Sequence, residues 1–379
     1  MIIAYCNNFD GFNNNKILNK ELAAKYPGMM WIPLLAEMLS LVGDTLVTGD
    51  IAISLIQSNT CDPREVFVIQ EMTARDGKKL INMGARPFLL TSLESPLIAW
   101  HFYDTVNKIA PIFENRILFS GLFNSFITNS GNNYNMTYPN FDIDAMVLSK
   151  EWSERKFMVL VAANKYAIEP FRLPDLKNIK SYIFWLAVRI IGKLSRTRKD
   201  CLKKQLNLKR VELIEYFGKD NLLELFGTRW ELTNVLPRRI ESRVRPILNK
   251  LNPRVCKDKI KEISNYKFAV CFENVRYQGY ITEKIIDCFA AGVIPIYCGA
   301  PDVDEYIPRG SYINFDDFED LDKLKKYLMT ISDTDANEII SCGQAFIKSE
   351  KGLMYSNKGF AEFVYKLTRN TIEVERCQQ

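Results

Sequence analysis

The sequence has only one histidine and no long uninterrupted hydrophobic run. The histidine, His101, has a simpler interpretation as a core or surface residue than as a catalytic one. The longest apolar run outside the predicted strands, 182–191, is interrupted by Arg189 and is too short to span a bilayer. Residues 1–6 read as a strand without a charged leader or a small-residue cleavage site, so we expect no signal peptide.

Internal repeats, low-complexity tracts and Cys-x-x-Cys pairs are also lacking. Hydrophobic residues make up 47% of the chain and charged residues 25%, which excludes disordered, collagen-like and coiled-coil classes. The nine cysteines are an odd number and lie mostly in apolar surroundings. We therefore expect reduced thiols and a cytoplasmic protein.

Charge is distributed unevenly along the chain. The net charge is +5, but residues 176–261 contain 22 Lys and Arg against 8 Asp and Glu. This excess predicts an anionic partner, such as a nucleoside diphosphate, an acidic lipid-linked glycan or a membrane surface; a solvated basic face is the alternative. Within it, 179–204 predicts a basic amphipathic helix that either lies on an anionic membrane or packs on its own domain. No nucleic-acid-binding module is present, and we expect no nucleic-acid partner.

The first half of the chain alternates between strand-like and helix-like stretches. Its strands are predicted over 66–70 and 87–91, and its helices over 74–82 and 97–108. This alternation favours a parallel α/β sheet. The Asn-rich stretch 129–140 has the composition of a loop.

At 379 residues, the chain is long enough for two domains. A strand predicted over 157–161 opens the second half, a basic insertion follows over 170–208, and a terminal helix is predicted over 360–375. The predicted organisation is a first α/β domain over 1–150, a second over 155–348, and a C-terminal helical segment over 349–379.

Residues 266–299 form the most informative unit. The apolar run 268–272 reads as a buried strand that ends at Glu273 and Asn274. Thr282 is a predicted helix N-cap, and Lys284 lies in the first turn of that helix. Ligands of open α/β sheets bind beyond the carboxyl ends of strands, where helix amino termini present N–H groups to anions. The unit therefore predicts a site for a phosphorylated sugar donor.

The same stretch resembles a known family. Phe272-Glu273-Asn274, followed by Tyr280-Ile281-Thr282-Glu283-Lys284, is similar to the donor motif of the bacterial-type α1,3/4-fucosyltransferase family (glycosyltransferase family 10). The resemblance continues through 292–318, and upstream through 209–217 and 225–230.

The resemblance implies a fold and a reaction. The implied fold is two Rossmann-like α/β domains facing across a cleft (GT-B type), with the acceptor in the first domain and the donor in the second. The implied reaction transfers L-fucose from GDP-fucose to a hydroxyl of a GlcNAc- or Glc-containing glycan, with inversion and an α1,3 or α1,4 linkage. No cofactor or metal is expected to be obligatory. The alternatives are another nucleotide sugar, or a non-catalytic, membrane-associated glycan-binding protein.

The resemblance also assigns roles to individual residues. Glu94, in Glu-Ser-Pro, is similar to the family's general base, because a carboxylate can accept the proton of the attacking hydroxyl; a helix-capping carboxylate is the alternative. Arg210 and Lys284 are implied to bind the diphosphate, although Arg210 could instead pair with Glu212 or Glu215. The resemblance implies that four further residues contact the ribose, the phosphates or the sugar: Asn274, Tyr280, Glu283 and Glu273.

Overall fold

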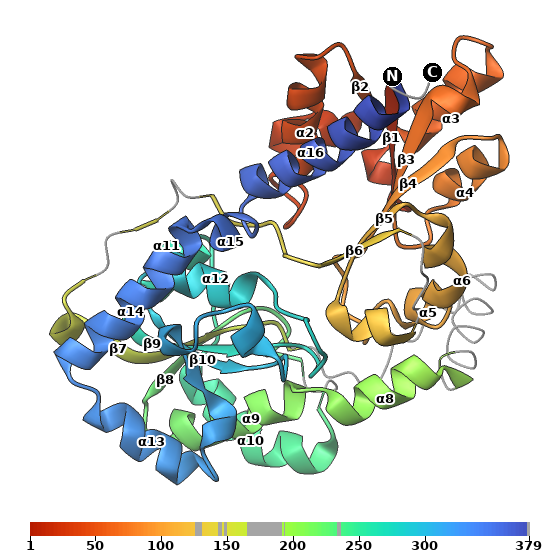
Figure 1. Ribbon diagram of the computed structural model, residues 1–379. Helices are drawn as coiled ribbons and strands as arrows, with labels where there is room; N and C mark the ends of the chain where they lie inside the picture. The colour runs from red at the N-terminus through yellow and green to blue at the C-terminus, as the bar shows by residue number, and fades with distance from the viewer. Residues whose placement is uncertain are drawn as a thin grey trace. The chain divides into compact units, whose positions relative to one another are not determined.

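The computed structural model describes residues 1–125, 131–142, 146–147, 150–164, 192, 194–232 and 236–376. The chain forms two α/β units (Figure 1). The first consists of 1–94, 105–143 and 348–379, and the second of 95–104 and 144–347. The short segment 95–104 thus belongs to the second unit, whereas the sequence predicted it in the first.

The first unit contains a sheet of six parallel strands in the order β2-β1-β3-β4-β5-β6. Its strands are β1 (Ile2–Cys6), β2 (Thr45–Thr48), β3 (Val66–Glu71), β4 (Arg86–Thr91), β5 (Asn115–Leu118) and β6 (Asn132–Asn135). β3 is buried along its whole length, in agreement with the apolar run 66–69 that begins it. Because β2 lies on one side of β1 and all later strands lie on the other, the topology switches between β1 and β3.

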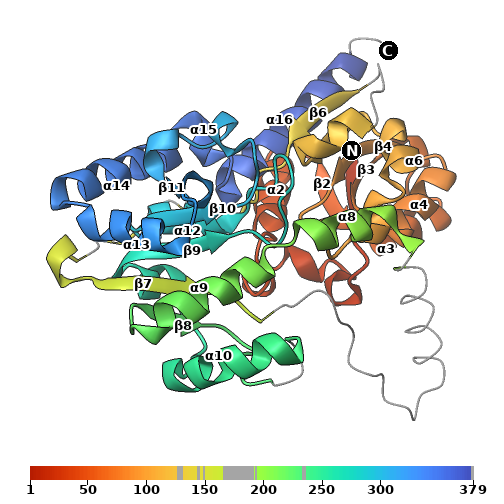
Figure 2. The ribbon, with the colours of Figure 1, turned by 90° about the horizontal axis from the view of Figure 1, so that it is seen from below.

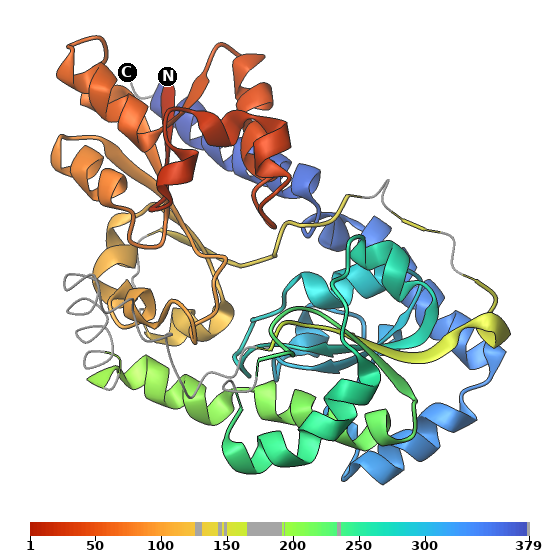
Figure 3. The same cartoon turned by 180° about the vertical axis from the view of Figure 1, so that it is seen from behind.

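Seven α-helices lie in the described part of this unit. They are α1 (Lys20–Ala23), α2 (Trp31–Ser40), α3 (Gly49–Gln57), α4 (Arg75–Asn82), α6 (Val106–Ile109), α15 (Glu350–Leu353) and α16 (Asn357–Arg376). The terminal helix α16 lies beside α2 (Figures 1 and 3). Phe360 packs edge-on against Trp31 with ring centroids 5.2 Å apart, and Arg369 pairs with the buried Asp44 at 3.1 Å.

The second unit contains five parallel strands in the order β11-β10-β9-β7-β8. The strands are β7 (Lys156–Val161), β8 (Leu223–Phe226), β9 (Tyr266–Phe272), β10 (Ile294–Cys298) and β11 (Ile313–Asn314). Taken in chain order, this is the topology of the first five strands of the other sheet, and its switch point lies between β7 and β9.

Helices cover both faces of this sheet, with α12 over one face and α9 and α10 over the other (Figure 1). Figure 2 shows α9 and α10 side by side. The α-helices of the unit are α5 (Trp100–Tyr103), α8 (Arg196–Lys204), α9 (Asn207–Lys219), α10 (Arg238–Leu251), α11 (Lys259–Ile263), α12 (Glu283–Ala290), α13 (Leu321–Thr330) and α14 (Asp333–Lys348).

Two predictions for the first half were wrong. The helix expected over 97–108 is broken into α5 and α6 at Asp104, whose Oδ1 accepts the N–H of Thr197 at 3.2 Å. The stretch 129–140, expected to be a loop, contains β6. Its asparagines are held by β5, since Asn132 Nδ2 donates to Asn115 Oδ1 at 3.1 Å.

The predicted amphipathic helix 179–204 lies mostly outside the described residues. Its last part is a separate helix, α8, that begins after Ser195, whose Oγ accepts the N–H of Arg198. Among the described residues, no helix combines the length and the hydrophobicity needed to cross a membrane. The eight described cysteines form no disulfide.

Candidate active site

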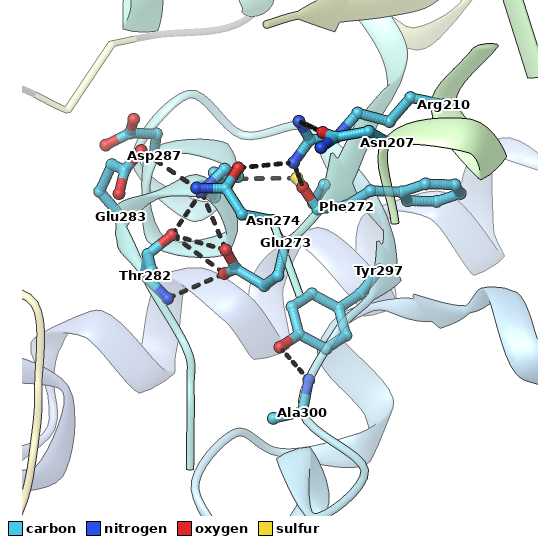
Figure 4. Close-up of polar contacts among 12 residues, drawn as sticks. Asn207, Arg210, Phe272, Glu273, Asn274, Thr282, Glu283, Asp287, Tyr297 and Ala300 are labelled. Atoms are coloured by element: carbon cyan, nitrogen blue, oxygen red, sulfur yellow. Dashed lines mark hydrogen bonds and ion pairs between the residues drawn. The ribbon is translucent and has the colours of Figure 1, made fainter. Parts of the chain in front are cut away.

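The loop after β9 lies at the switch point of the second sheet. β9 ends at Phe272 and α12 begins at Glu283, so 273–282 connects the carboxyl end of a strand to the amino end of a helix. Sheets of this topology bind ligands at this position. Three predicted donor residues of the loop and of the first turn of α12 lie close together in Figure 4: Glu273, Asn274 and Glu283.

Glu273 is the buried centre of this group. Its carboxylate has no exposed surface and accepts hydrogen bonds from the Thr282 N–H (2.9 Å), the Thr282 hydroxyl (2.9 Å to Oε2) and Lys284 Nζ (2.9 Å). A buried carboxylate is tolerated only with such partners. Because Glu273 is fully covered, it holds Lys284 in place rather than presenting an oxygen to solvent.

Thr282 is the residue before α12, as predicted, but it does not cap the helix with its side chain. Its backbone is extended, with φ −112° and ψ −171°, and no N–H of α12 donates to its hydroxyl. That hydroxyl is committed to Glu273 and accepts a hydrogen bond from Lys284 Nζ at 2.7 Å. An N-cap hydroxyl normally binds an N–H of the first turn. Here the hydroxyl instead joins the two charged residues.

Arg210 connects α9 to the same loop. Its side chain is buried; Nη1 donates to Asn207 Oδ1 at 3.1 Å, and Nη2 donates to the Phe272 carbonyl and to Asn274 Oδ1. Burial lowers the pKa of Arg210, and the nearby charge of Glu273 opposes that effect. Within the described part of the chain, its buried Nε has no hydrogen-bond partner.

The sequence had left open a pairing of Arg210 with Glu215. Glu215 instead pairs with Arg243, with 3.0 Å between Oε2 and Nη2. The guanidinium of Arg210 donates instead to the Phe272 carbonyl and to Asn274 of the β9 loop, and its predicted diphosphate role stays a prediction.

Glu283 lies among opposite charges. Burial alone would raise its pKa, but the charges of Lys284 and Lys259 outweigh burial and lower the pKa of Glu283 to about 2. Lys259, on α11, pairs with Asp287 of α12 at 2.6 Å. Burial raises the pKa of Asp287 despite this partner. Because its own pKa is lowered to about 2, Glu283 is a carboxylate at neutral pH.

Lys259 was missed by sequence reasoning. No motif surrounds it, and its partner lies 28 residues further along the chain. The available signal was the i, i+4 spacing of Glu283 and Asp287, which places two carboxylates on one side of α12 and calls for a nearby cation.

Tyr280 is buried in the turn before α12. Its N–H donates to the Tyr277 carbonyl at 3.2 Å, and the preceding Gly279 N–H donates to Asp302 Oδ1 at 2.9 Å. Gly279 has φ +67°, a conformation that side chains disfavour, so the glycine is required by the turn. The turn fixes Tyr280 two residues before Thr282.

Glu94 belongs to the first unit and follows β4. Glu71, at the end of the neighbouring β3, pairs in register with Thr91 of β4. The carboxylate of Glu71 is buried and accepts the Tyr5 hydroxyl at 2.7 Å and Asn7 Nδ2 at 2.5 Å. Burial raises the pKa of Glu71, two hydrogen bonds lower it, and the charge of Glu94 raises it further. Two carboxyl groups therefore interact at this edge of the sheet.

The alternative role of Glu94 as a helix cap does not match the structure. α5 begins at Trp100, and its N-cap is Ala99.

Among the described residues, no group of three or more His, Cys, Asp and Glu side chains could hold a metal ion.

Comparison with known families identifies the second unit. Residues 204–338 match the sequence model described as "Glycosyltransferase family 10 (fucosyltransferase) C-term". The chain carries a glycosyltransferase family 10 domain. This segment contains β8 to β11 and all of the predicted donor residues, so the family resemblance of the sequence is confirmed.

The match to individual relatives is local. The α-(1,3)-fucosyltransferase FucT of Helicobacter pylori is 43% identical over 72 residues, which are 19% of this chain and 15% of that protein. The matched segment is thus a small part of the relative's length. A crystal structure of α1,3-fucosyltransferase with GDP-fucose is 16% identical and covers 90% of this chain and 81% of that one, with a TM-score of 0.37.

A third comparison concerns the fold. The sucrose-phosphate synthase of Thermosynechococcus elongatus is 9% identical, covers 99% of this chain and 100% of that one, and has a TM-score of 0.60. At this identity the likeness shows the fold alone. The two parallel-sheet domains have the GT-B glycosyltransferase fold, as predicted, while the predicted cleft between them stays a prediction.

Proposed function

We propose that this glycosyltransferase transfers L-fucose from GDP-fucose to a hydroxyl of a GlcNAc- or Glc-containing glycan, forming an α1,3 or α1,4 linkage. The observation that carries the proposal is the ordered group of Arg210, Lys284 and the buried Glu273 at the β9 switch point, within a family 10 domain. A nucleoside diphosphate is the anion that this arrangement of cations suits.

Arg210 and Lys284 would neutralise the diphosphate as it leaves. An ammonium group has three N–H donors, and two of those of Lys284 point to Glu273 and Thr282. Lys284 Nζ also lies 3.7 Å from Glu283 Oε1, and its third donor would turn to a phosphate oxygen when the diphosphate binds. The planar guanidinium of Arg210 has one buried donor, Nε, without a partner among the described residues. Fixed cations of this kind stabilise charge that develops on the leaving group.

We assign the remaining predicted donor residues to two roles, contact with the donor and positioning of Lys284. Asn274, Tyr280 and Glu283 would contact the ribose, the phosphates or the fucose. The predicted role of Glu273 changes, because its carboxylate is fully buried and its oxygens bind Thr282 and Lys284. We assign Glu273 to positioning Lys284.

Glu94 would act as the general base. It would remove the acceptor hydroxyl proton while that oxygen attacks the anomeric carbon from the face opposite GDP. The bond from that carbon to the phosphate oxygen breaks, GDP leaves with the bonding electrons, and the configuration inverts. The position of Glu94 beyond the carboxyl end of β4, whose neighbouring strand β3 ends at Glu71, supports a catalytic carboxylate at this sheet edge.

We further propose that no metal is obligatory, that the enzyme works in the cytoplasm, and that its acceptor is a lipid-linked glycan such as a lipopolysaccharide precursor. The basic helix α8, which carries Arg196, Arg198 and Lys199, supports contact with an anionic inner membrane face. Sedimentation with anionic vesicles tests this contact, and protein that stays in the supernatant at low salt contradicts it.

Turnover that survives EDTA supports metal independence, and turnover that EDTA abolishes and Mg²⁺ restores contradicts it.

The donor assignment is tested by calorimetry with GDP-fucose, GDP-mannose and UDP-glucose, followed by turnover of the best donor on a glycan array. We expect GDP-fucose to bind most tightly and Arg210→Ala to weaken catalysis about tenfold to a hundredfold, since a charge-assisted hydrogen bond contributes about 1.5 to 3 kcal/mol. Tight binding of UDP-glucose without a response to GDP-fucose would show a different donor. Glycan binding without turnover would favour the non-catalytic alternative.

A further inference from the structure

The switch point of the first sheet carries a polar network that the proposed mechanism does not use. β1 and β3 are neighbours there, with Tyr5 opposite Ile69 and Cys6 opposite Gln70. The Tyr5 hydroxyl and Asn7 Nδ2 both donate to the buried carboxylate of Glu71. The equivalent switch point of the second sheet holds the donor residues. In this topology the β1–β3 edge is the expected ligand position of the first unit.

Two asparagines fix the loop that follows β1. Besides binding Glu71, Asn7 accepts the Phe9 N–H through Oδ1 at 2.7 Å. Asn8 bridges to the loop after β3, since its Nδ2 donates to the Thr73 carbonyl and its Oδ1 accepts the Arg75 N–H, both at 3.0 Å. The loop is thus held to the end of β3 by side-chain bonds that give Phe9 a defined position.

Phe9 is the exposed aromatic residue of this loop. Its ring contacts Phe12 edge-on with centroids 4.8 Å apart, and Tyr26 at 5.4 Å. A Cβ on Gly11 would lie 2.5 Å from its ring, so the glycine backbone packs directly against it. Phe12 is buried, whereas 47% of the surface of Phe9 remains exposed. Phe9 is therefore held by neighbouring residues while nearly half of its surface stays open to solvent.

We propose that Phe9 is the platform of a sugar-binding subsite at the carboxyl edge of β1 and β3, and that the subsite takes a pyranose ring of the glycan acceptor. The proposal rests on the proposed function for the identity of its ligand. A pyranose presents an apolar C–H face that suits a flat aromatic ring, and its hydroxyls need polar partners at the edge of that ring. The exposed side chains of Asp10 and Arg75, 3.7 Å apart, lie on the two loops that Asn8 joins and offer such partners.

A single exposed aromatic residue needs no function by itself. Three features distinguish Phe9: its loop lies at the switch point, the loop is pinned by side-chain bonds, and Glu94 follows the next strand of the same sheet. A subsite here would bring an acceptor sugar to the sheet edge that carries the proposed base.

The test measures glycan binding directly, without turnover. The wild type and the variants Phe9→Ala, Phe9→Leu and Phe9→Trp are titrated by saturation-transfer NMR with GlcNAc- and Glc-terminated oligosaccharides in the presence of GDP. We expect Phe9→Ala and Phe9→Leu to weaken glycan binding about twofold to tenfold, because a leucine restores apolar volume but not a flat face. Phe9→Trp should keep it. Tyr327→Ala, which removes an exposed aromatic from α13 of the second unit, is the matched control and should change nothing.

The variants should all bind GDP-fucose as the wild type does. Binding by Phe9→Leu or Phe9→Ala equal to the wild type, or no binding of any glycan by the wild type, would overturn the subsite. Glycan binding that depends on Phe9 without any fucose transfer would leave the subsite intact and refute the proposed function. Fucose transfer with unchanged acceptor binding in the variants would refute the subsite alone.

Discussion

The pair formed by Lys284 and Glu273 allows folding and catalysis to be separated. Replacing Lys284 by Met removes a cation that is 19% exposed and leaves the fully buried Glu273 with the N–H and hydroxyl of Thr282 as its remaining partners. Breaking a buried pair on one side costs about 3 to 5 kcal/mol. Because Thr282 still donates to the carboxylate, we expect the lower end of that range for the loss in free energy of unfolding.

The double variant Lys284→Met/Glu273→Gln removes the unpaired charge. A neutral amide can still accept from Thr282, so we expect most of the lost stability to return. Catalysis should not return, since the phosphate contact of Lys284 is still missing. The proposed phosphate contact would be of the charge-assisted kind, about 1.5 to 3 kcal/mol, so its loss should lower kcat/KM with GDP-fucose about tenfold to a hundredfold.

The assay combines urea unfolding with initial rates for the wild type, the two single variants Lys284→Met and Glu273→Gln, and the double variant. The single variant Glu273→Gln should lose less activity than Lys284→Met, because the ammonium group remains. If the double variant regained activity together with stability, Lys284 would be a structural residue only. Equal stability of Lys284→Met and the wild type would refute the buried pair.

Three further predictions concern other residues. Glu94→Gln should keep GDP-fucose affinity by calorimetry but slow transfer about 10² to 10⁴-fold, and unchanged turnover would remove Glu94 from the mechanism. Lys259→Met should lower the free energy of unfolding by about 3 to 5 kcal/mol, because the buried Asp287 loses its partner. Adding Asp287→Asn to the same chain should restore part of this stability. Urea unfolding that shows no loss of stability in Lys259→Met would contradict the pair. Burial raises the pKa of Glu71 above its usual range, so the wild type should lose stability as pH rises from about 4.5 through that raised pKa. The difference in stability between Glu71→Gln and the wild type in thermal unfolding should therefore grow in favour of Glu71→Gln over the same pH interval. A difference between the two proteins that stays constant with pH would contradict the raised pKa of Glu71.

The sequence predicted the β9 unit well because its signals are local. A buried strand, a polar strand end and a helix start follow one another within the residues 266–299, and each depends on near neighbours in the chain. The strands at 66–71 and 86–91 were found for the same reason. Grouping Glu273, Thr282 and Lys284 also needed only the short loop between them.

The features that were missed depend on distant partners. β6 is a strand because its backbone pairs with β5, to which Asn132 also binds through Asn115, and the Asn-rich composition conceals this. The break between α5 and α6 involves Thr197, far along the chain from Asp104. Lys259 becomes part of the site through Asp287 and Glu283, which both lie on another helix. Such contacts override local preference and leave no periodic signal in the sequence.

The most direct test of the account is one transfer reaction followed by NMR. The protein is incubated with GDP-fucose and N-acetyllactosamine, and the configuration and position of the new glycosidic bond are read from the product. The account predicts release of GDP and an α-linked fucose on the GlcNAc unit, formed by inversion of the β-linked donor and lost in Glu94→Gln. A β-linked product, or no transfer from GDP-fucose to any GlcNAc- or Glc-containing glycan while another nucleotide sugar is consumed, would contradict it.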